Sequence, residues 1–410
     1  MNKIEIQDFR CFRQLSVSLT PGINLFIGDN ASGKTSFLLA CKYAVNSFFS
    51  GYSDVYTLWT YPQKDDFLRL VLGEKRMRTQ PINLRFSFSS DDFESGIDFK
   101  LDNCTPLVLT CKNEKSRKPL ISGLRNLRDY GRFLANNAFD LQSDSIGNQN
   151  FALPLFASYS THGIHKKTSV NSKYFKDISQ TPSFGYYLCA STDGLLEHWI
   201  RRLLILEEAN KNPVERQIVI NALKDMFGSE GCDVIKDFEV RINYQDVVCL
   251  FNDGREIPVA ILSDGYRRLV SIVVDIAFRC ALLNSLKYGE EAARLTKGSV
   301  IIDEIDLHLH PSLQAVVLKA LHKTFPGIQF IVSTHAPMVM SGVESNEDNC
   351  VIHMDYDKDN KDYTAIRVNT YGMDLSTLAE TVLNVPSRNP EVKQDLDFLA
   401  ELVKGKSTMC

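Results

Sequence analysis

The sequence lacks a long hydrophobic run and any closely spaced pair of cysteines. No apolar stretch approaches the ~20 residues that are needed to cross a bilayer, and the opening MNKIEIQDF lacks the basic and then apolar order of a signal peptide. The ten cysteines form no C-x-x-C pair, which fits neither a zinc ribbon nor a disulfide framework. These absences predict a soluble, cytoplasmic protein with reduced thiols and no membrane partner.

The sequence also lacks an excess of charge of either sign. Its 46 basic and 50 acidic residues give a formal net charge of −4, which argues against a general polyanion binder. No internal repeat and no sustained heptad pattern is present, which argues against a long coiled coil. The length of 410 residues suggests two or three modules, although one large domain with insertions fits equally well.

Hydrophobic periodicity predicts an α/β fold. Alternating patterns open the chain, and buried strands alternate with helices near its end, which indicates a parallel core. The predicted helices are 33–47, 194–227, 265–285, 311–324, 374–384 and 389–404. The predicted strands are 2–8, 15–19, 23–27, 82–88, 96–101, 106–111, 152–160, 238–242, 247–251, 257–261, 299–303, 328–333, 350–354 and 364–368.

A glycine-rich segment directly follows the apolar strand 23–27. Residues 28–35, GDNASGKT, match G-x-x-x-x-G-K-[ST] at every fixed position. The glycines of such a loop let backbone N–H groups surround phosphates, and the helix that follows adds the positive end of its dipole. We therefore predict an ATP site in which Lys34 reaches the β and γ phosphates and Thr35 ligates Mg²⁺; the alternative is a chance glycine-rich turn. The candidate nucleotide-binding residues are Gly28, Asp29, Asn30, Ala31, Ser32, Gly33, Lys34, Thr35 and Ser36.

The apolar strand at 299–304, SVIIDE, ends in two acidic residues. Asp303 is expected to ligate Mg²⁺, directly or through water, and Glu304 to polarise the attacking water as the catalytic base. A second apolar strand, 328–333, leads into Thr334 and His335. This places an imidazole where it could sense the γ-phosphate, so His335 is a second candidate catalytic residue. An ordinary loop histidine is the alternative.

Two other polar clusters allow a metal interpretation. His308 and His310 could be zinc ligands, but no third ligand is close in sequence, and Pro311 at the start of a helix explains the turn. The acidic segment 353–362, HMDYDKDNKD, lies between two short strands and is more simply a charged hairpin turn. The sequence therefore predicts no nuclease centre.

A further motif, LSDGYR at 262–267, precedes the predicted helix 265–285. It resembles the LSGGQ-type signature of ATP-binding-cassette ATPases, and DEIDLHLHP followed by STHAP resembles the RecF, SMC and OLD-type branch of that family. The motifs stand in family order and cover 1–48 and 255–342. The resemblance implies a P-loop NTPase, with an ATP-binding-cassette head, an antiparallel β subdomain and a helical insertion.

The family resemblance also implies a shared site. Ser263 and Gly265 of one subunit are expected to close over the γ-phosphate bound by another, so hydrolysis requires a homodimer or a higher homo-oligomer. Generic N-capping of the helix is the alternative for Ser263. Asp264 and Tyr266 depart from the family's second glycine and glutamine. The family's Q-loop glutamine is not identifiable, and its candidate substitutes are Ser160, Thr161 and His162.

These motifs suggest four segments. Residues 1–190 form the first ATPase lobe and the β subdomain, with insertions at about 49–82 and 112–150. The other three are a helical insertion at 191–235, a second lobe at 236–345 with the signature, the acidic strand and His335, and C-terminal strands and helices at 346–410.

The C-terminal stretch 371–402 resembles the tail of stand-alone ATPases in Septu, retron and PARIS defence systems, which work with a separate nuclease. The resemblance implies an ATPase switch that dimerises on ATP and controls a separately encoded effector, a nuclease or a toxin, in anti-phage defence. A RecF-like DNA-repair ATPase without an effector nuclease is the alternative. A scaffold with degraded hydrolysis is the third reading, against which Lys34, Thr35, Asp303 and Glu304 argue.

Two surfaces are candidates for partner contacts. The segment 112–132 carries a local charge of +5 and, with the basic cluster at 165–176, could bind nucleic acid; solvated loops are the alternative. The C-terminal helices could dock the effector through apolar residues at helix spacing, or they could merely cover the sheet. These apolar residues are Leu375, Leu378, Val382, Leu396, Leu399 and Leu402.

Overall fold

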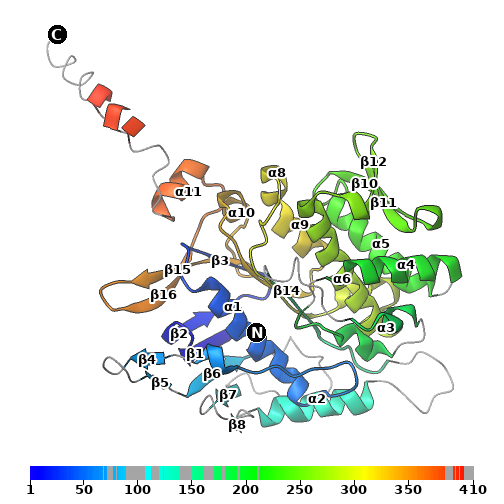
Figure 1. Cartoon of the computed structure of the whole chain (residues 1–410), viewed down its shortest axis with the longest axis horizontal. Helices are drawn as coiled ribbons and strands as arrows, with labels where there is room; N and C mark the ends of the chain where they lie inside the picture. Colours follow the sequence, from blue (N-terminus) through cyan, green and yellow to red (C-terminus); the bar gives the residue numbers. More distant parts are fainter. Residues whose placement is uncertain are drawn as a thin grey trace.

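The computed structural model contains two main β-sheets and a helical lobe (Figure 1). It describes residues 1–67, 69–71, 77–79, 81–88, 107–111, 120–122, 124–138, 149–160, 170–177, 181–191, 194–209, 212–383, 391–392, 394–396 and 398–400. The predicted strand 96–101 lies outside these residues.

The first sheet is antiparallel and has the order β2-β1-β6-β7-β8. Alternation of buried and exposed residues along β1 directs Ile4 and Ile6 into the core, as expected for a sheet with one solvated face. A separate hairpin pairs β4 with β5. The strands are β1 (Lys3–Phe9), β2 (Phe12–Ser18), β4 (Arg69–Val71), β5 (Met77–Thr79), β6 (Ile82–Ser87), β7 (Leu107–Cys111) and β8 (Leu120–Ser122).

The second sheet forms the core and has the order β16-β15-β3-β14-β13-β9. Neighbouring strands from β15 to β9 are parallel, and only the edge strand β16 runs antiparallel. This arrangement confirms the predicted α/β class with a parallel core. The strands are β3 (Ile23–Ile27), β9 (Leu155–Tyr159), β13 (Gly298–Ile302), β14 (Ile328–Ser333), β15 (Cys350–Asp357) and β16 (Asp362–Val368).

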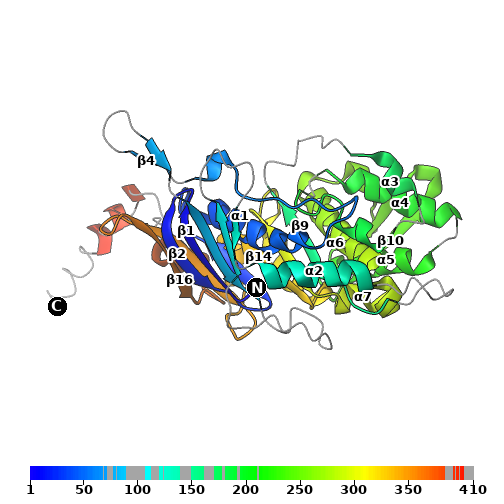
Figure 2. The same ribbon diagram turned by 90° about the horizontal axis from the view of Figure 1, so that it is seen from below.

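Helix α1 (Lys34–Asn46) lies between the two sheets (Figure 2). It contacts β1 and β6 of the antiparallel sheet on one side and β9, β13 and β14 of the core on the other. Phe37 of α1 packs on Phe26 of β3 with ring centroids 4.4 Å apart. The first turn of α1 is thereby fixed at the end of β3.

The helical lobe includes a small antiparallel sheet of β10 (Ile235–Arg241), β11 (Asp246–Phe251) and β12 (Glu256–Pro258). The α-helices outside α1 are α2 (Arg125–Asn137), α3 (Ser172–Lys176), α4 (Leu196–Ala209), α5 (Pro213–Phe227), α6 (Asp264–Tyr288), α7 (Ala292–Leu295), α8 (Pro311–Gln314), α9 (Val317–Thr324), α10 (Pro337–Ser341) and α11 (Leu375–Thr381). Short 3₁₀ turns are η1 (Ser47–Ser50), η2 (Lys64–Asp66), η5 (Pro182–Tyr186), η6 (Ile242–Tyr244), η7 (Val259–Ile261) and η8 (Gly289–Glu291).

Most predicted bounds shift by a few residues, and three predicted elements are divided or cut short. The predicted helix 194–227 is two helices, because Asn212 adopts a left-handed conformation (φ 46°) and caps α5, which begins at Pro213. The predicted helix 311–324 divides into α8 and α9. The predicted strand 257–261 ends at Pro258 and continues as the turn η7.

Helix α6 forms the centre of the helical lobe. The segment 264–295, which contains α6, is long and apolar enough to cross a membrane by length and composition alone, but 83% of its most apolar window is buried inside the molecule. This is the environment of a core helix. The structure describes the side chains of seven cysteines, and all seven are free thiols. Their reduced state stays a prediction.

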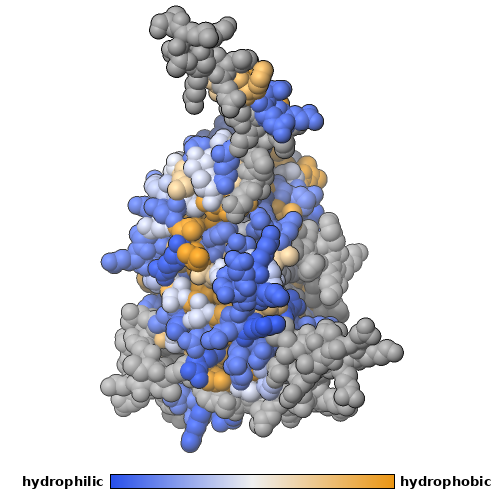
Figure 3. Space-filling model, turned by 90° about the vertical axis from the view of Figure 1, so that its left-hand side faces the viewer, coloured by the Kyte–Doolittle hydropathy of each residue, from blue (hydrophilic) through white to orange (hydrophobic). Residues whose placement is uncertain are grey.

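The C-terminal elements divide into a packed part and a protruding part. Leu378 of α11 is fully buried, and α11 contacts α10. The helical residues between 391 and 400 stand away from the body (Figure 1) and present apolar side chains (Figure 3). Helix α11 therefore packs on the body through α10, whereas the residues between 391 and 400 leave large apolar side chains exposed; coverage of the sheet by these helices stays a prediction.

Candidate nucleotide site

Four strands of the core sheet end beside one another at the same edge. The phosphate loop follows β3, Asp303 follows β13, Thr334 follows β14 and Ser160 follows β9. Carboxyl ends of parallel strands form the usual ligand crevice of an open α/β sheet. The sheet order therefore brings together motifs that lie as far apart in the sequence as 28 and 335.

The phosphate loop needs glycine at two positions. Gly28 (φ 138°) and Gly33 (φ 93°) adopt backbone conformations that are unfavourable for other residues. A Cβ atom at Gly28 would lie 2.1 Å from the carbonyl oxygen of Met354, and one at Gly33 would lie 2.8 Å from the ring of Phe12. Between them, Asp29, Asn30 and Ala31 are exposed. Neighbouring β15 and β2 thus fix a loop whose outer residues face solvent.

Lys34 folds back over the loop. Its Nζ donates to the carbonyl oxygens of Gly28 and Asp29, at 2.8 Å each, and lies 3.2 Å from Ser32 Oγ. Burial lowers the pKa of Lys34 to about 8, although the nearby carboxylates of Asp303 and Asp29 act in the opposite direction. The ammonium group is therefore held where an incoming phosphate would meet it.

Thr35 and Asp303 meet across the site. Thr35 Oγ1 lies 3.4 Å from Asp303 Oδ1, and the same carboxylate oxygen accepts a hydrogen bond from Ser333 Oγ at 2.5 Å. Mg²⁺ prefers hard oxygen ligands such as a hydroxyl and a carboxylate, completed by phosphate and water. The two predicted metal ligands therefore fit the ion.

Glu304 sits on a turn with a left-handed backbone. Its φ is 51°, an uncommon conformation for a residue with a side chain. Its backbone N–H donates to Ser333 Oγ at 2.8 Å, so one serine contacts both acidic residues of the turn. Asp303 is buried and Glu304 is half-buried. The turn thus separates a buried carboxylate beside Thr35 from a more accessible one.

Asp306 connects this turn with the His335 segment. Its Oδ1 accepts hydrogen bonds from Thr334 Oγ1 at 2.5 Å and from the backbone N–H of His335 at 3.3 Å. His335 is half-buried. The loop after β13 and the loop after β14 are therefore joined directly.

The two histidines considered as zinc ligands have other surroundings. His310 caps α8, where its ring nitrogen accepts from Ser312 N–H, and both His308 and His310 are exposed. Within the described ranges, no group of three or more His, Cys, Asp and Glu side chains is arranged to hold a metal. The acidic segment 353–362 forms the β15–β16 hairpin, in which Asp357 accepts from two turn amides.

The signature residues begin α6. Ser263 occupies the N-cap position, but its hydroxyl makes no capping hydrogen bond and the residue is exposed. Gly265 is buried against the loop after β13, since a Cβ atom there would lie 2.2 Å from the carbonyl oxygen of His308. Among the described residues, no hydrogen bond joins Ser263 or Gly265 to the phosphate loop of the same chain. Helix capping therefore does not explain Ser263.

The substitutes proposed for the Q-loop glutamine are only partly placed. Ser160 is half-buried and directly follows β9 at the site edge, whereas Thr161 and His162 lie outside the described residues. The basic residues 112–119 and 165–167 also lie outside them. The sequence motifs include Ser333 and Asp306 but gave them no role, and Arg268, one residue beyond the signature motif, was missed; each contacts a residue of the site.

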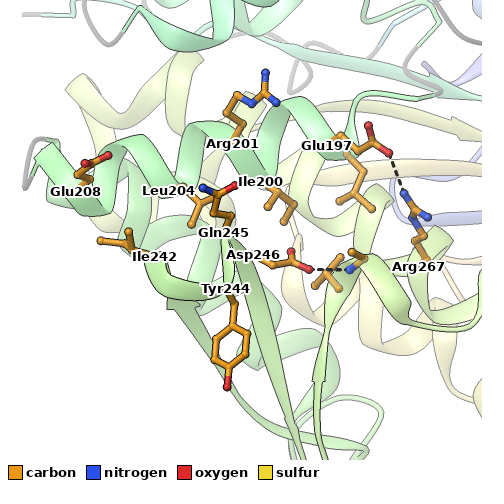
Figure 4. A pocket seen from close by; sticks show the side chains of 13 residues that line it. Glu197, Ile200, Arg201, Leu204, Glu208, Ile242, Tyr244, Gln245, Asp246 and Arg267 are labelled. Carbon is orange, nitrogen blue, oxygen red and sulfur yellow. Dashed lines mark hydrogen bonds and ion pairs between the residues drawn. The ribbon is translucent and has the colours of Figure 1, made fainter.

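A pocket of about 590 Å³ lies beside the signature segment (Figure 4). It is bounded by α4, the β10–β11 turn and the residues just before α6. An ion pair between Glu197 and Arg267 (3.1 Å) lies at one end, and Asp246 accepts from the backbone N–H of Ala260 at 2.8 Å. This pocket is separate from the phosphate loop.

The parallel core, the phosphate loop and the adjacent acidic turn together define a P-loop ATPase head. The chain belongs to the family described as "AAA domain, putative AbiEii toxin, Type IV TA system", which matches residues 23–341. Within it, the chain fits the RecF, SMC and OLD branch of ATPases, as the motifs predicted.

Three curated relatives illustrate this placement. The chain is 35% identical over 175 residues to "Retron Vc95 probable ATPase" of Vibrio cholerae serotype O1 biovar El Tor, covering 42% of this chain and 33% of that protein. It is 26% identical over 214 residues to "Septu protein PtuA" of Bacillus thuringiensis, covering 50% and 51%. It is 22% identical over 353 residues to "OLD nuclease" of Thermus scotoductus (strain ATCC 700910 / SA-01), covering 82% and 59%. The chain thus spans between a third and three fifths of these relatives.

A solved structure with partial similarity is described as "Crystal structure of the SmcHead bound to the C-winged helix domain of ScpA". The TM-score is 0.47 at 13% identity, and the match covers 90% of this chain and 98% of that one.

Proposed function

We propose that the chain is an ATP-hydrolysing switch that dimerises on ATP and controls a separately encoded effector in anti-phage defence. The observation that carries the proposal is the contact of Thr35 with Asp303, next to Glu304 and beside a complete phosphate loop. Similarity to retron and Septu ATPases supports the defence context. A cytoplasmic location remains a prediction.

The proposed hydrolysis uses these residues in distinct roles. Lys34 releases the loop carbonyls and binds the β and γ phosphates, while Thr35 and Asp303 hold Mg²⁺, which offsets phosphate charge when bound. Glu304 accepts a proton from the water that attacks the γ-phosphate. His335 is placed on the adjoining loop to sense that phosphate, and Asp306 links it to the acidic turn.

The proposed dimer supplies the remaining contacts. Ser263 has an exposed hydroxyl without a capping role, and we propose that it and Gly265 close on the γ-phosphate bound to a second copy. The effector would then respond differently to the open and to the closed dimer. We propose that the chain itself cuts no nucleic acid; the OLD nuclease relative makes this a point to test directly.

Glu304→Gln tests the hydrolytic role. Loss of the base should lower kcat by about 10²–10⁴, or roughly 3–5 kcal/mol, while ATP binding persists because the phosphate loop is intact. Exposed Glu290→Gln is the matched control. Turnover measured by phosphate release and dimer formation measured by light scattering give the two readouts. Near-normal turnover of Glu304→Gln would show that Glu304 is not the base.

A phage challenge tests the two-component role. Cells would carry the chain alone, the neighbouring gene alone, both, or both with Glu304→Gln. Protection should require both genes and Glu304. The chain with Glu290→Gln, expressed together with the neighbouring gene, should protect normally. Protection by the chain alone, or DNA cleavage by the purified chain, would contradict the proposal.

A second candidate function, DNA binding of the RecF type, is favoured by one observation. Arg125 and Arg132 of α2 have side chains that are 91% and 63% exposed, although Asp129 lies 3.8 Å from each. Arg128 was also predicted to bind phosphate, but it is half-buried and therefore less accessible than the other two arginines. Gly51 packs against its backbone. The candidate nucleic-acid surface on α2 is therefore narrower than predicted.

A further inference from the structure

Arg268 holds the acidic turn by its backbone. It lies five residues after Ser263, in the first turns of α6. Its Nη1 donates to the carbonyl oxygen of Glu304 at 2.5 Å, and its Nη2 donates to that of Asp303 at 2.8 Å. The planar fork of a guanidinium can serve two consecutive carbonyls at once, which a single ammonium group does poorly.

Helix α6 is also connected to the Asp303–Glu304 turn through a second set of hydrogen bonds. Asp275 of α6 accepts from Tyr159 Oη at 2.7 Å, and the carbonyl oxygen of Tyr159 accepts from the backbone N–H of Asp303 at 3.0 Å. Asp275 is 1% exposed and is also bound by Trp199 and Arg279. Because buried polar groups are costly to leave unpaired, breaking this connection would be costly.

The backbone of Glu304 requires such support. Its left-handed conformation (φ 51°) persists only where neighbouring groups enforce it. Ser333 Oγ binds the N–H of Glu304, and Arg268 binds its carbonyl oxygen. Both ends of the residue are therefore held, one from the core strand β14 and the other from the signature helix.

We propose that Arg268 is a positioning residue for hydrolysis, which aims the Glu304 carboxylate at the attacking water. The inference rests on the proposed function. Since Ser263 and Arg268 belong to the start of one helix, closure of the signature on a second copy's nucleotide moves the support of Glu304 in its own chain. Hydrolysis at one site of the dimer thereby depends on occupancy of the other.

Three variants test the positioning role. Arg268→Met should lower kcat at least about tenfold, because small displacements of a catalytic group cost up to ~10²-fold, while the ATP dissociation constant stays within about twofold. Arg268→Lys can serve one carbonyl and should give an intermediate kcat. Arg201→Met is the matched control, because Arg201 is exposed on α4 at the edge of the pocket (Figure 4), outside the signature motif, and should retain wild-type kcat.

A double variant separates positioning from general structure. If Arg268 acts through Glu304, the turnover of Arg268→Met/Glu304→Gln should equal that of Glu304→Gln alone, since no base remains to be aimed. Multiplicative losses would overturn the inference. Cooperativity of turnover in ATP concentration should also weaken in Arg268→Met.

The remaining outcomes are distinct. Wild-type kcat in Arg268→Met, with Glu304→Gln inactive, would refute the positioning role and leave the proposed ATPase standing. A joint loss of melting temperature and ATP affinity in Arg268→Met, unrelieved by lysine, would show a merely structural residue and also overturn the inference. Absence of ATP turnover by the wild-type dimer would refute the proposed function itself.

Discussion

At the scale of single residues, Lys34 is subject to two opposing requirements. It must be charged to bind phosphate, yet in the free protein it is buried under the loop carbonyls, and burial lowers its pKa to about 8. Phosphate binding restores the preference for the charged form. The free protein therefore loses its binding-competent form as the pH rises through this value.

We expect ATP affinity to be constant below about pH 7 and to fall up to tenfold per pH unit above about pH 8, because one proton must be taken up on binding. Calorimetric titration with a non-hydrolysable analogue at several pH values measures this slope. Lys34→Arg keeps its charge throughout, so its affinity should not vary with pH. A flat profile for the wild type would contradict the prediction.

The lowered pKa of Lys34 has the opposite effect on the stability of the nucleotide-free protein. Between about pH 8 and 10.5 the unfolded chain binds more protons at Lys34 than the folded chain, so this residue makes the free energy of unfolding rise with pH. Nucleotide affinity and apo stability therefore change in opposite directions over this range.

The residues that support the site were harder to predict than those that form it. The phosphate loop is recognisable because its spacing is local, as is the pair Asp303 and Glu304 at a strand end. Ser333 and Arg268 contact that pair from 29 to 36 residues away along the chain. Ser333 begins the STHAP motif, but neither that motif nor an arginine on a helix indicates a contact with the acidic turn.

At the scale of elements, α2 presents two well-exposed arginines on one helix. If α2 binds duplex DNA, Arg125→Glu/Arg132→Glu should weaken binding and reduce the slope of log affinity against log salt by up to ~0.9 for each lost phosphate contact. Fluorescence anisotropy at several salt concentrations measures both.

The matched control for α2 is a double charge reversal elsewhere on the surface, Arg294→Glu/Lys319→Glu, which changes net charge equally. Equal effects of the two double variants would indicate only a general electrostatic contribution. Unchanged affinity in both would assign Arg125 and Arg132 to a solvated helix face.

The C-terminal elements lead to a prediction about where the chain can be truncated without loss of the folded head. Leu378 is buried against the head, whereas Leu396 and Leu399 are 38% and 54% exposed, and Leu402 lies outside the described residues. Truncation after Leu383 should leave a folded, ATP-binding head that no longer binds the product of the neighbouring gene. Truncation at Tyr371 removes Leu378 and should cost about 2–5 kcal/mol of stability.

Melting curves and co-purification with that gene product distinguish the two truncations. Retained partner binding after truncation at Leu383 would place the docking surface elsewhere. Equal loss of stability in both truncations would show that residues beyond α11 also pack on the head.

Element boundaries were predictable where composition changes sharply. The break between α4 and α5 was missed, although residues 207–212, EEANKN, are mostly polar and Asn212 and Pro213 form a recognisable capping pair. The order of the core strands was not accessible, since β3 pairs with strands from the far end of the sequence.

At the scale of the whole molecule, the proposed shared site predicts complementation between inactive chains. Lys34→Ala removes the phosphate contact, and Ser263→Arg blocks the signature, so each protein alone should lack turnover. In a mixture, one interface of each hybrid dimer contains an intact Lys34 and an intact Ser263. Part of the wild-type phosphate release should therefore return.

Subunit exchange must be shown independently, by mixing chains with different fluorophores. Two copies of the same variant labelled and mixed provide the control. If exchange occurs and no turnover returns, hydrolysis does not use a signature from a second chain.

The strand order of the core also determines when, during synthesis of the chain, the nucleotide site can form. The phosphate loop follows β3, but both strands that flank β3 lie about 300 residues later, beginning at Ile328 and Cys350. At ~5–20 residues per second, the ribosome needs roughly 15–60 seconds to supply them. During that interval the nascent chain has the phosphate loop but neither Asp303 nor Glu304 beside it. The proposed nucleotide site is therefore complete only after residues 303–357 have been synthesised, and a nascent chain that is interrupted before them lacks this site.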